Sequence, residues 1–155
     1  MRIPSTHSKG FTFTEVVIAI AIFMILAGVG VGAYFRYYNF ALVDMDINGA
    51  ITLVSRARFL AQKNATSSDY GIHLDPATHT LTQFQDAYTP GAPGNVSFTL
   101  GVLRITDLAL SPVPGVTDQI VFERWTGKTV NAGTFTIGND DYTYTFNVNP
   151  QGVVN

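Results

Sequence analysis

Side chains that could catalyse a reaction or bind a metal are few and scattered in this sequence. His73 and His79 flank a predicted hairpin, without an HExxH motif or a third ligand at a recognisable spacing. We interpret both as polar residues of an exposed strand. Asn139-Asp140-Asp141 could coordinate calcium through its oxygens, but an acidic turn before a strand is the more ordinary interpretation. We predict no catalytic residue, no enzyme activity and no cofactor; Asp140 and Asp141 are only weak metal candidates.

Three further kinds of chemistry lack the residues they require. The chain has no cysteine, which excludes disulfides, thiolate metal sites and cysteine nucleophiles. The glycines at 28, 30 and 32 are not followed by Lys-Ser or Lys-Thr, so they do not form a phosphate-binding loop. Nine Lys and Arg residues stand against eleven Asp and Glu, which leaves no basic excess for nonspecific nucleic-acid binding.

Glu15 is a carboxylate placed at the edge of a long apolar run. Val16 to Phe35 is a stretch of 20 residues without an acidic, basic, amide or histidine side chain. A helix of that length is about 30 Å long, the thickness of the hydrocarbon core of a bilayer. Arg36 and the neighbouring tyrosines would anchor its end at the interface. The sequence predicts a membrane span in which Glu15 needs a partner, because drawing a carboxylate toward the bilayer centre costs about 2–3 kcal/mol.

The first ten residues of the chain, Met1 to Gly10, differ from a secretory signal peptide. They are small and polar and carry Arg2 and Lys9, and no A-x-A cleavage site follows the apolar stretch. Positive charge on this side predicts a single span, with the N-terminus in the cytoplasm and the C-terminal part outside.

The segment Lys9-Gly10-Phe11-Thr12-Phe13-Thr14-Glu15, followed by Val16 to Ile20, resembles the N-terminus of type IV prepilins and type II secretion pseudopilins. The resemblance implies that a prepilin peptidase cuts after Gly10 and N-methylates Phe11. Met1 to Gly10 would then be a cytoplasmic leader, lost together with His7. Glu15 matches the acidic fifth residue of the mature chain in that family.

The resemblance also suggests a partner for Glu15. Cleavage would give Phe11 a charged α-amine, which could pair with Glu15 of a neighbouring subunit and set its axial register. The alternative is a carboxylate that lies among the headgroups, favoured by the helix dipole.

Gly28, Gly30 and Gly32 interrupt the apolar run. Gly28 and Gly32 form a small-xxx-small pair that would let two helices approach closely. Each glycine also costs about 1 kcal/mol relative to alanine, so the helix would most readily melt here. The alternative is the ordinary abundance of glycine in membrane helices.

Beyond Arg36 the apolar pattern predicts an amphipathic helix that continues the span, giving one helix from about Thr12 to Lys63. The predicted buried stripe is Phe40, Val43, Ile47, Ile51, Val54, Ala57 and Ala61. The charged residues off this stripe are predicted to face water or neighbouring subunits; they are Asp44, Asp46, Arg56, Arg58 and Lys63.

The remainder has the threonine content and alternating pattern of strands joined by turns. The predicted strands are Tyr70 to Leu74, Thr80 to Phe84, Val96 to Val102, Gln119 to Trp125, Thr134 to Ile137 and Tyr142 to Val148. Loops are predicted at Thr89 to Gly94 and Ser111 to Gly115, and a helix stop at Asn64 to Gly71. The fold class is α+β: leader 1–10, long helix 11–64 and an antiparallel β-sheet head 65–155.

A second resemblance concerns the head. The segments Ile120 to Phe122, Phe135 to Ile137 and Val148 to Val154 are similar to the minor pseudopilin H and FimT-like branch. Some members of that branch bind DNA through arginines near the C-terminus, whereas this chain ends Gly152-Val153-Val154-Asn155. Losing Arg2 and Lys9 would leave seven basic residues against eleven acidic, which disfavours DNA.

The prediction is therefore a structural, non-enzymatic subunit of a type II secretion pseudopilus or a type IV pilus, in the inner membrane before assembly. Its partners would be prepilin peptidase, other pilin subunits, an inner-membrane assembly platform and the lipid bilayer. Two alternatives remain open: a DNA-binding minor pilin, and an unrelated single-span protein whose β-domain binds a ligand.

Overall fold

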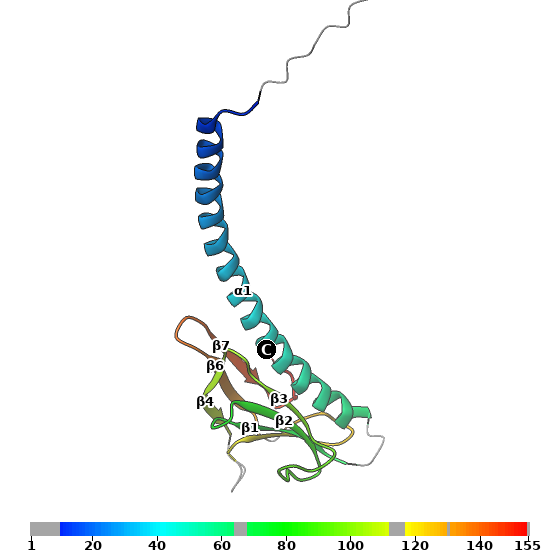
Figure 1. Ribbon diagram of the computed structural model, residues 1–155. Coiled ribbons are helices and arrows are strands. Elements are labelled where there is room, and N and C mark those ends of the chain that lie inside the picture. Colours follow the sequence, from blue (N-terminus) through cyan, green and yellow to red (C-terminus); the bar gives the residue numbers. More distant parts are fainter. Residues whose placement is uncertain (1–9, 64–67, 112–116, 130, 155) are drawn as a thin grey trace, which may run out of the picture. The chain divides into compact units, whose positions relative to one another are not determined.

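The computed structural model describes residues 10–63, 68–111, 117–129 and 131–154. One helix, α1 (Phe13–Lys63), precedes seven strands (Figure 1). The helix has almost the bounds that the sequence predicts, and it contains no proline. Residues 1–9 of the predicted leader, residues 64–67 of the helix stop and residues 112–116 of the predicted loop lie outside the described residues.

The chain divides into two compact units, the first ending at Phe40 and the second beginning at Ala41. In the first unit, every described residue of α1 is exposed, including the whole apolar run. This part of α1 is long and apolar enough to cross a membrane, by its length and composition. Lipid or the helices of other proteins can cover such a surface, because water solvates it poorly.

The second unit contains two antiparallel sheets, so the α+β class is confirmed. The first sheet has the order β3-β2-β1-β5 and the second β4-β6-β7. Their strands are β1 (Tyr70–Asp75), β2 (Thr80–Gln85), β3 (Val96–Thr99), β5 (Gln119–Phe122), β4 (Arg104–Leu110), β6 (Gly133–Gly138) and β7 (Thr143–Val148). The hairpin of β1 and β2 turns at Asp75, whose carboxylate accepts the N–H groups of Ala77 and Thr78.

The part of α1 from Ala41 onward buries a stripe against the sheets. The buried residues are Val43, Asp46, Ala50, Leu53, Val54, Ala57 and Ala61. Four of the predicted stripe residues are therefore confirmed, while Ile47 and Ile51 lie half-buried at its margin. Phe40 is 58 % exposed, so its predicted burial is wrong. The stripe also includes Asp46, Ala50 and Leu53, which the sequence pattern did not assign to it. The small alanine side chains in it let the helix backbone approach the sheets closely.

Two strands end earlier than the alternating pattern predicts. β3 ends at Thr99 because the N–H groups of Gly101, Val102 and Leu103 bond to a carboxylate of α1 instead of to a strand. β5 ends at Phe122, and Trp125 has a φ of 67° that no strand residue adopts. The Trp125 N–H donates to the carbonyl of Ala61, at 2.9 Å.

Strand β4 is absent from the sequence prediction. Its pairing with β6 shifts register between Ile105 and Asp107, which identifies a bulge at Thr106. Because of the extra residue, Ile105 and Leu108 both turn toward the core although they are three residues apart in the sequence. The strand therefore lacks the regular two-residue alternation of apolar side chains by which strands are predicted.

Candidate functional site

Gly10 and Phe11 form an exposed peptide link immediately before α1. A Cβ atom built on Gly10 would meet nothing within 4 Å, and Phe11 is 89 % exposed. Neither residue belongs to the helix, which begins at Phe13. The bond between them therefore lies outside regular secondary structure and is exposed.

Thr12 and Glu15 close the first turn of α1 with reciprocal hydrogen bonds. Glu15 Oε2 accepts the Thr12 N–H at 2.8 Å and the Thr12 hydroxyl at 2.8 Å. The Glu15 N–H donates to Thr12 Oγ1 at 3.3 Å. This is a capping box, and the acidic side chain also faces the positive end of the helix dipole. Glu15 therefore has a local structural role in addition to any role in assembly, and it is fully accessible.

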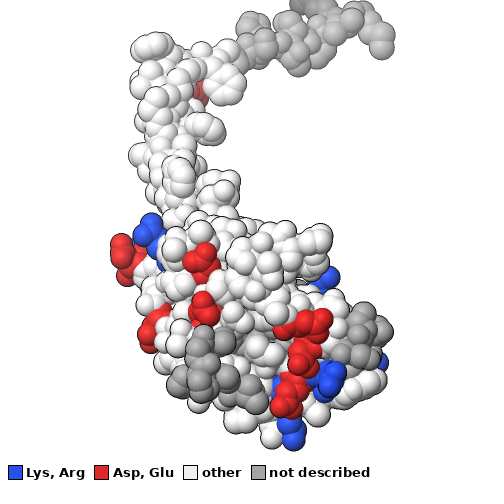
Figure 2. All heavy atoms as spheres, turned by 90° about the horizontal axis from the view of Figure 1, so that it is seen from below, with Lys and Arg blue, Asp and Glu red and all other residues white. Residues whose placement is uncertain are grey.

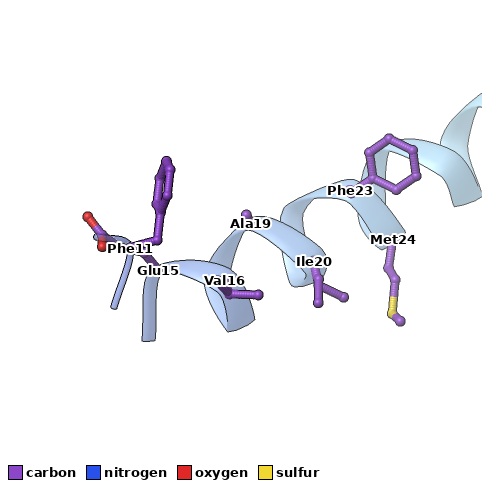
Figure 3. Close-up of a pocket in the computed structure, with 7 residues that line it drawn as sticks. All are labelled: Phe11, Glu15, Val16, Ala19, Ile20, Phe23 and Met24. Carbon is purple, nitrogen blue, oxygen red and sulfur yellow. The ribbon is translucent and has the colours of Figure 1, made fainter. Parts of the chain in front are cut away.

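An apolar groove of about 530 Å³ runs along α1 beside Glu15. Phe11, Glu15, Ala19 and Phe23, each four residues apart, line one side; Val16, Ile20 and Met24 line the other (Figure 3). Rows of side chains spaced by four residues are the ridges that pack into the grooves of another helix. The small Ala19 lies between Phe11 and Phe23, so the groove has space for a side chain of a neighbouring helix.

The helix continues without a break through Gly28, Gly30 and Gly32. A Cβ atom at any of the three would meet nothing within 4 Å. Close approach of a partner helix and local melting in this region both stay predictions.

The histidines and the acidic turn do not assemble a catalytic or metal site. His73 is half-buried in β1, where its ring stacks on Tyr88 at 3.8 Å and its Nδ1 lies 3.5 Å from Asp118. The prediction of an exposed-strand residue is therefore wrong for His73, and it is wrong for His79, which is half-buried in the turn between β1 and β2. Asn139 Oδ1 accepts the N–H groups of Asp141 and Tyr142, which forms an Asx turn. Within the part of the chain that the structure describes, no three His, Cys, Asp or Glu residues cluster as metal ligands do.

Asp46 is buried in the second unit, although its place off the apolar stripe predicts a residue that faces water. It is 1 % exposed, and its two carboxylate oxygens accept the backbone N–H groups of Gly101, Val102 and Leu103 at 2.8–3.0 Å. The prediction that Asp46 faces water is wrong because these donors satisfy the buried charge. Asp46 lies three residues after Val43 and four residues before Ala50, and positions with this spacing share a helix face. This spacing was the feature of the sequence that indicated its burial.

Charge on this protein is concentrated away from the apolar run. Figure 2 shows the first part of α1 as an almost entirely uncharged surface, whereas acidic and basic side chains gather on the second unit. Asp44, Arg56 and Lys63 are exposed as predicted, and Arg58 is half-buried.

Comparison with known proteins identifies the N-terminal segment. Residues 5–31 match the family model described as the prokaryotic N-terminal methylation motif. No curated protein and no solved structure matches the chain.

Proposed function

We propose that this chain, which carries the N-terminal methylation motif of prepilins and pseudopilins, is a structural subunit of a type IV pilus or a type II secretion pseudopilus. The observation that carries the proposal is the order of features at the N-terminus. An exposed Gly10–Phe11 link precedes a capped helix start, and the part of α1 that follows, up to Phe40, is apolar and wholly exposed.

Processing follows from the first of these features. Prepilin peptidase would cut after Gly10 in the cytoplasmic membrane and methylate the amine of Phe11. The apolar run from Val16 to Phe35 would hold the subunit in the bilayer until assembly. The motif and the single apolar helix support membrane anchoring, with the N-terminus in the cytoplasm as the proposed orientation.

Assembly would then exchange lipid contacts for helix contacts. The groove beside Glu15 can accept a ridge of side chains from the helix of a second subunit. The α-amine of Phe11 from a neighbour would pair with the Glu15 carboxylate, whose Oε2 is already held by Thr12. A subunit inserted at the wrong height would leave both charges unpaired in an apolar surrounding, which is strongly unfavourable.

The processing step is tested by the intact mass of the protein purified from membranes of a host with active prepilin peptidase. We expect loss of Met1 to Gly10 and gain of one methyl group on Phe11. Gly10→Val should block both changes, whereas Glu15→Ala should leave cleavage intact. An uncut wild-type chain would contradict the proposal and favour a single-span protein with a ligand-binding β-domain.

The assembly role of Glu15 is separated from its capping role by two matched variants. Glu15→Gln keeps a capping acceptor but removes the charge, and Thr12→Val removes the capping hydroxyl but keeps the charge. We expect filaments from Thr12→Val and none from Glu15→Gln, as judged by electron microscopy and sedimentation. The reverse result would assign Glu15 to helix capping alone. A gel-shift series over salt tests the DNA-binding alternative, because phosphate contacts weaken as salt rises.

A further inference from the structure

A second groove lies in the second unit, between the last turns of α1 and the C-terminal segment. Its lining residues are Ser55, Arg58, Phe59, Gln62 and Gly152 to Val154, and its volume is about 270 Å³. The groove is separate from the one beside Glu15, and neither the motif nor the proposed processing uses it.

Arg58 makes this groove suitable for an anionic group. Its Nη2 donates to the carbonyl of Gln151 at 3.2 Å, while its buried Nε has no acceptor. Among the described residues, no carboxylate forms an ion pair with Arg58. That Nε is out of reach of an external group, but the guanidinium lines the groove and is only half-buried. An incoming carboxylate would gain a charge-assisted hydrogen bond from it.

Phe59 and Lys63 extend the site at its edge. Phe59 is 55 % exposed, and Lys63 Nζ lies 5.7 Å from the centre of its ring. The groove therefore offers two cationic groups and one aromatic face. A segment that carries two carboxylates and an aromatic ring would match it.

The turn between β6 and β7 has that composition. Asp140 and Asp141 are exposed, and Tyr142, 39 % exposed, follows them. The turn is already shaped by Asn139, whose side chain holds the N–H groups of Asp141 and Tyr142. Little conformational entropy would be lost when such a preorganised turn binds.

The turn and the groove lie at different levels of the second unit. Asn139 Nδ2 donates to the carbonyl of Val102, and the Val102 N–H bonds to Asp46. Arg58 is twelve residues farther along α1, which is about 18 Å along the helix axis. Figure 1 shows the turn between β6 and β7 well away from the C-terminal end of α1. One copy cannot place its own turn in its own groove.

We propose that the groove at Arg58 binds the Asp140–Asp141 turn of a second copy of this chain. The proposal rests on the proposed function, because it describes how the heads of successive subunits would meet. The contact joins two different surfaces and is therefore head-to-tail. Such a contact propagates as an open filament when the rotation between successive copies does not close a ring. A secreted acidic peptide in the groove is the competing occupant.

Cysteine cross-linking tests the contact directly, because the natural chain has no cysteine. Ser55→Cys combined with Thr143→Cys, which is exposed and leaves Tyr142 in place, should give a ladder of dimers, trimers and larger products when filaments of the full chain are oxidised. Either single variant should give no ladder. Ser55→Cys with Asp107→Cys, which lies on β4, is the matched control and should remain monomeric.

Charge exchange supplies the second measurement. Arg58→Glu should lower the yield of the cross-linked ladder at least tenfold, whereas Arg56→Glu, exposed and two residues away, should leave it unchanged. Adding Asp140→Arg and Asp141→Arg to Arg58→Glu should restore the ladder. Unfolding midpoints of all variants, measured in detergent micelles, exclude loss of folding as the cause.

The outcomes distinguish this contact from the proposed function. If the wild type forms filaments but the double-cysteine variant gives no ladder, and Arg58→Glu assembles like Arg56→Glu, the contact is overturned and the filament role stays intact. An uncut chain that forms no filaments would overturn the proposed function, and cross-linking of the concentrated chain in micelles then decides the contact alone. A cross-link to another protein, without one between copies, would assign the groove to the competing occupant.

Discussion

At the scale of single residues, Asp46 connects two parts of the chain that are more than 50 positions apart in sequence. Its carboxylate gathers the N–H groups of three consecutive residues, which would otherwise lie half-buried or buried without partners. The resulting contact ends β3 and holds the segment that leads into β4. A single acidic side chain thus determines where one sheet stops and the other begins.

Replacing Asp46 by alanine should lower the free energy of unfolding by about 2–4 kcal/mol, because buried N–H groups would lose their acceptor. Asp46→Asn should cost less, since one acceptor oxygen remains. The measurement is denaturant unfolding of the full chain in micelles, followed by the fluorescence of Trp125, the one tryptophan. Asp44→Ala, exposed and two residues away, is the control. Equal midpoints for the alanine variants would contradict this role.

The turn at Asp75 makes a pH-dependent contribution to stability. The hydrogen bond from the Thr78 hydroxyl, helped by the N–H groups of Ala77 and Thr78 and by the nearby His73, lowers the pKa of Asp75, although burial opposes the shift. A carboxylate whose pKa is lowered by folding stabilises the fold above its unfolded-state value of about 3.9. That stabilisation disappears as the pH falls through the lower, folded-state pKa.

Asp75→Asn should therefore be less stable than the wild type at neutral pH, and the difference should shrink in acid below the folded-state pKa. Unfolding midpoints of both proteins across the acid range check this expectation, with Asp86→Asn as the exposed control. A stability difference that stays constant down to the lowest pH would rule out the ionised form as its source.

At the scale of secondary-structure elements, α1 packs on the first sheet through a position without a side chain. A Cβ atom on Gly49 would overlap the ring of Phe98 in β3. The glycine lets the aromatic ring lie directly on the helix backbone, and Phe98 packs against the buried core there. The helix accepts a poor helix former at this point because packing outweighs intrinsic propensity.

Gly49→Ala should destabilise the fold by about 1–3 kcal/mol despite the better helix propensity of alanine. In a Phe98→Leu background the same change should cost less, because the smaller side chain leaves space for the new methyl group. A double-mutant cycle of unfolding free energies measures the coupling. Asn48→Ala, exposed on the same helix, serves as the control. Additive effects would mean that Gly49 and Phe98 do not share this contact.

At the scale of the whole molecule, two surfaces of opposite character belong to one chain. The first unit exposes its apolar side chains, whereas the second unit buries its own around α1 and the sheets. The long helix takes part in both units without a break. A surface so rich in exposed apolar groups is expected to lie in lipid or against other helices.

Ile25→Asp should weaken membrane anchoring, because an acidic residue near the centre of a span costs about 2.5–3.5 kcal/mol on insertion. Ile25 is 68 % exposed and lies inside the apolar run. Met45→Asp, at a residue 56 % exposed in the second unit, should leave anchoring unchanged. The fraction of each protein that resists extraction from membranes at alkaline pH provides the readout. Equal extraction of the two variants would argue against the predicted span.

Features that depend on neighbours in the chain were accessible from the sequence. The bounds of α1 and the hairpin of β1 and β2 follow from local spacing, because helix periodicity and turns involve residues at most a few positions apart. The methylation motif at residues 5–31 is local in the same sense.

Features that depend on distant partners were decided by the tertiary structure. Asp46 is buried because three N–H groups from residues 101–103 reach it, and β4 exists because β6 pairs with it across a bulge. Arg58 lines a groove because the C-terminal segment returns to the end of α1. Local sequence patterns do not predict such contacts, since each contact depends on which distant segments the folded chain brings together.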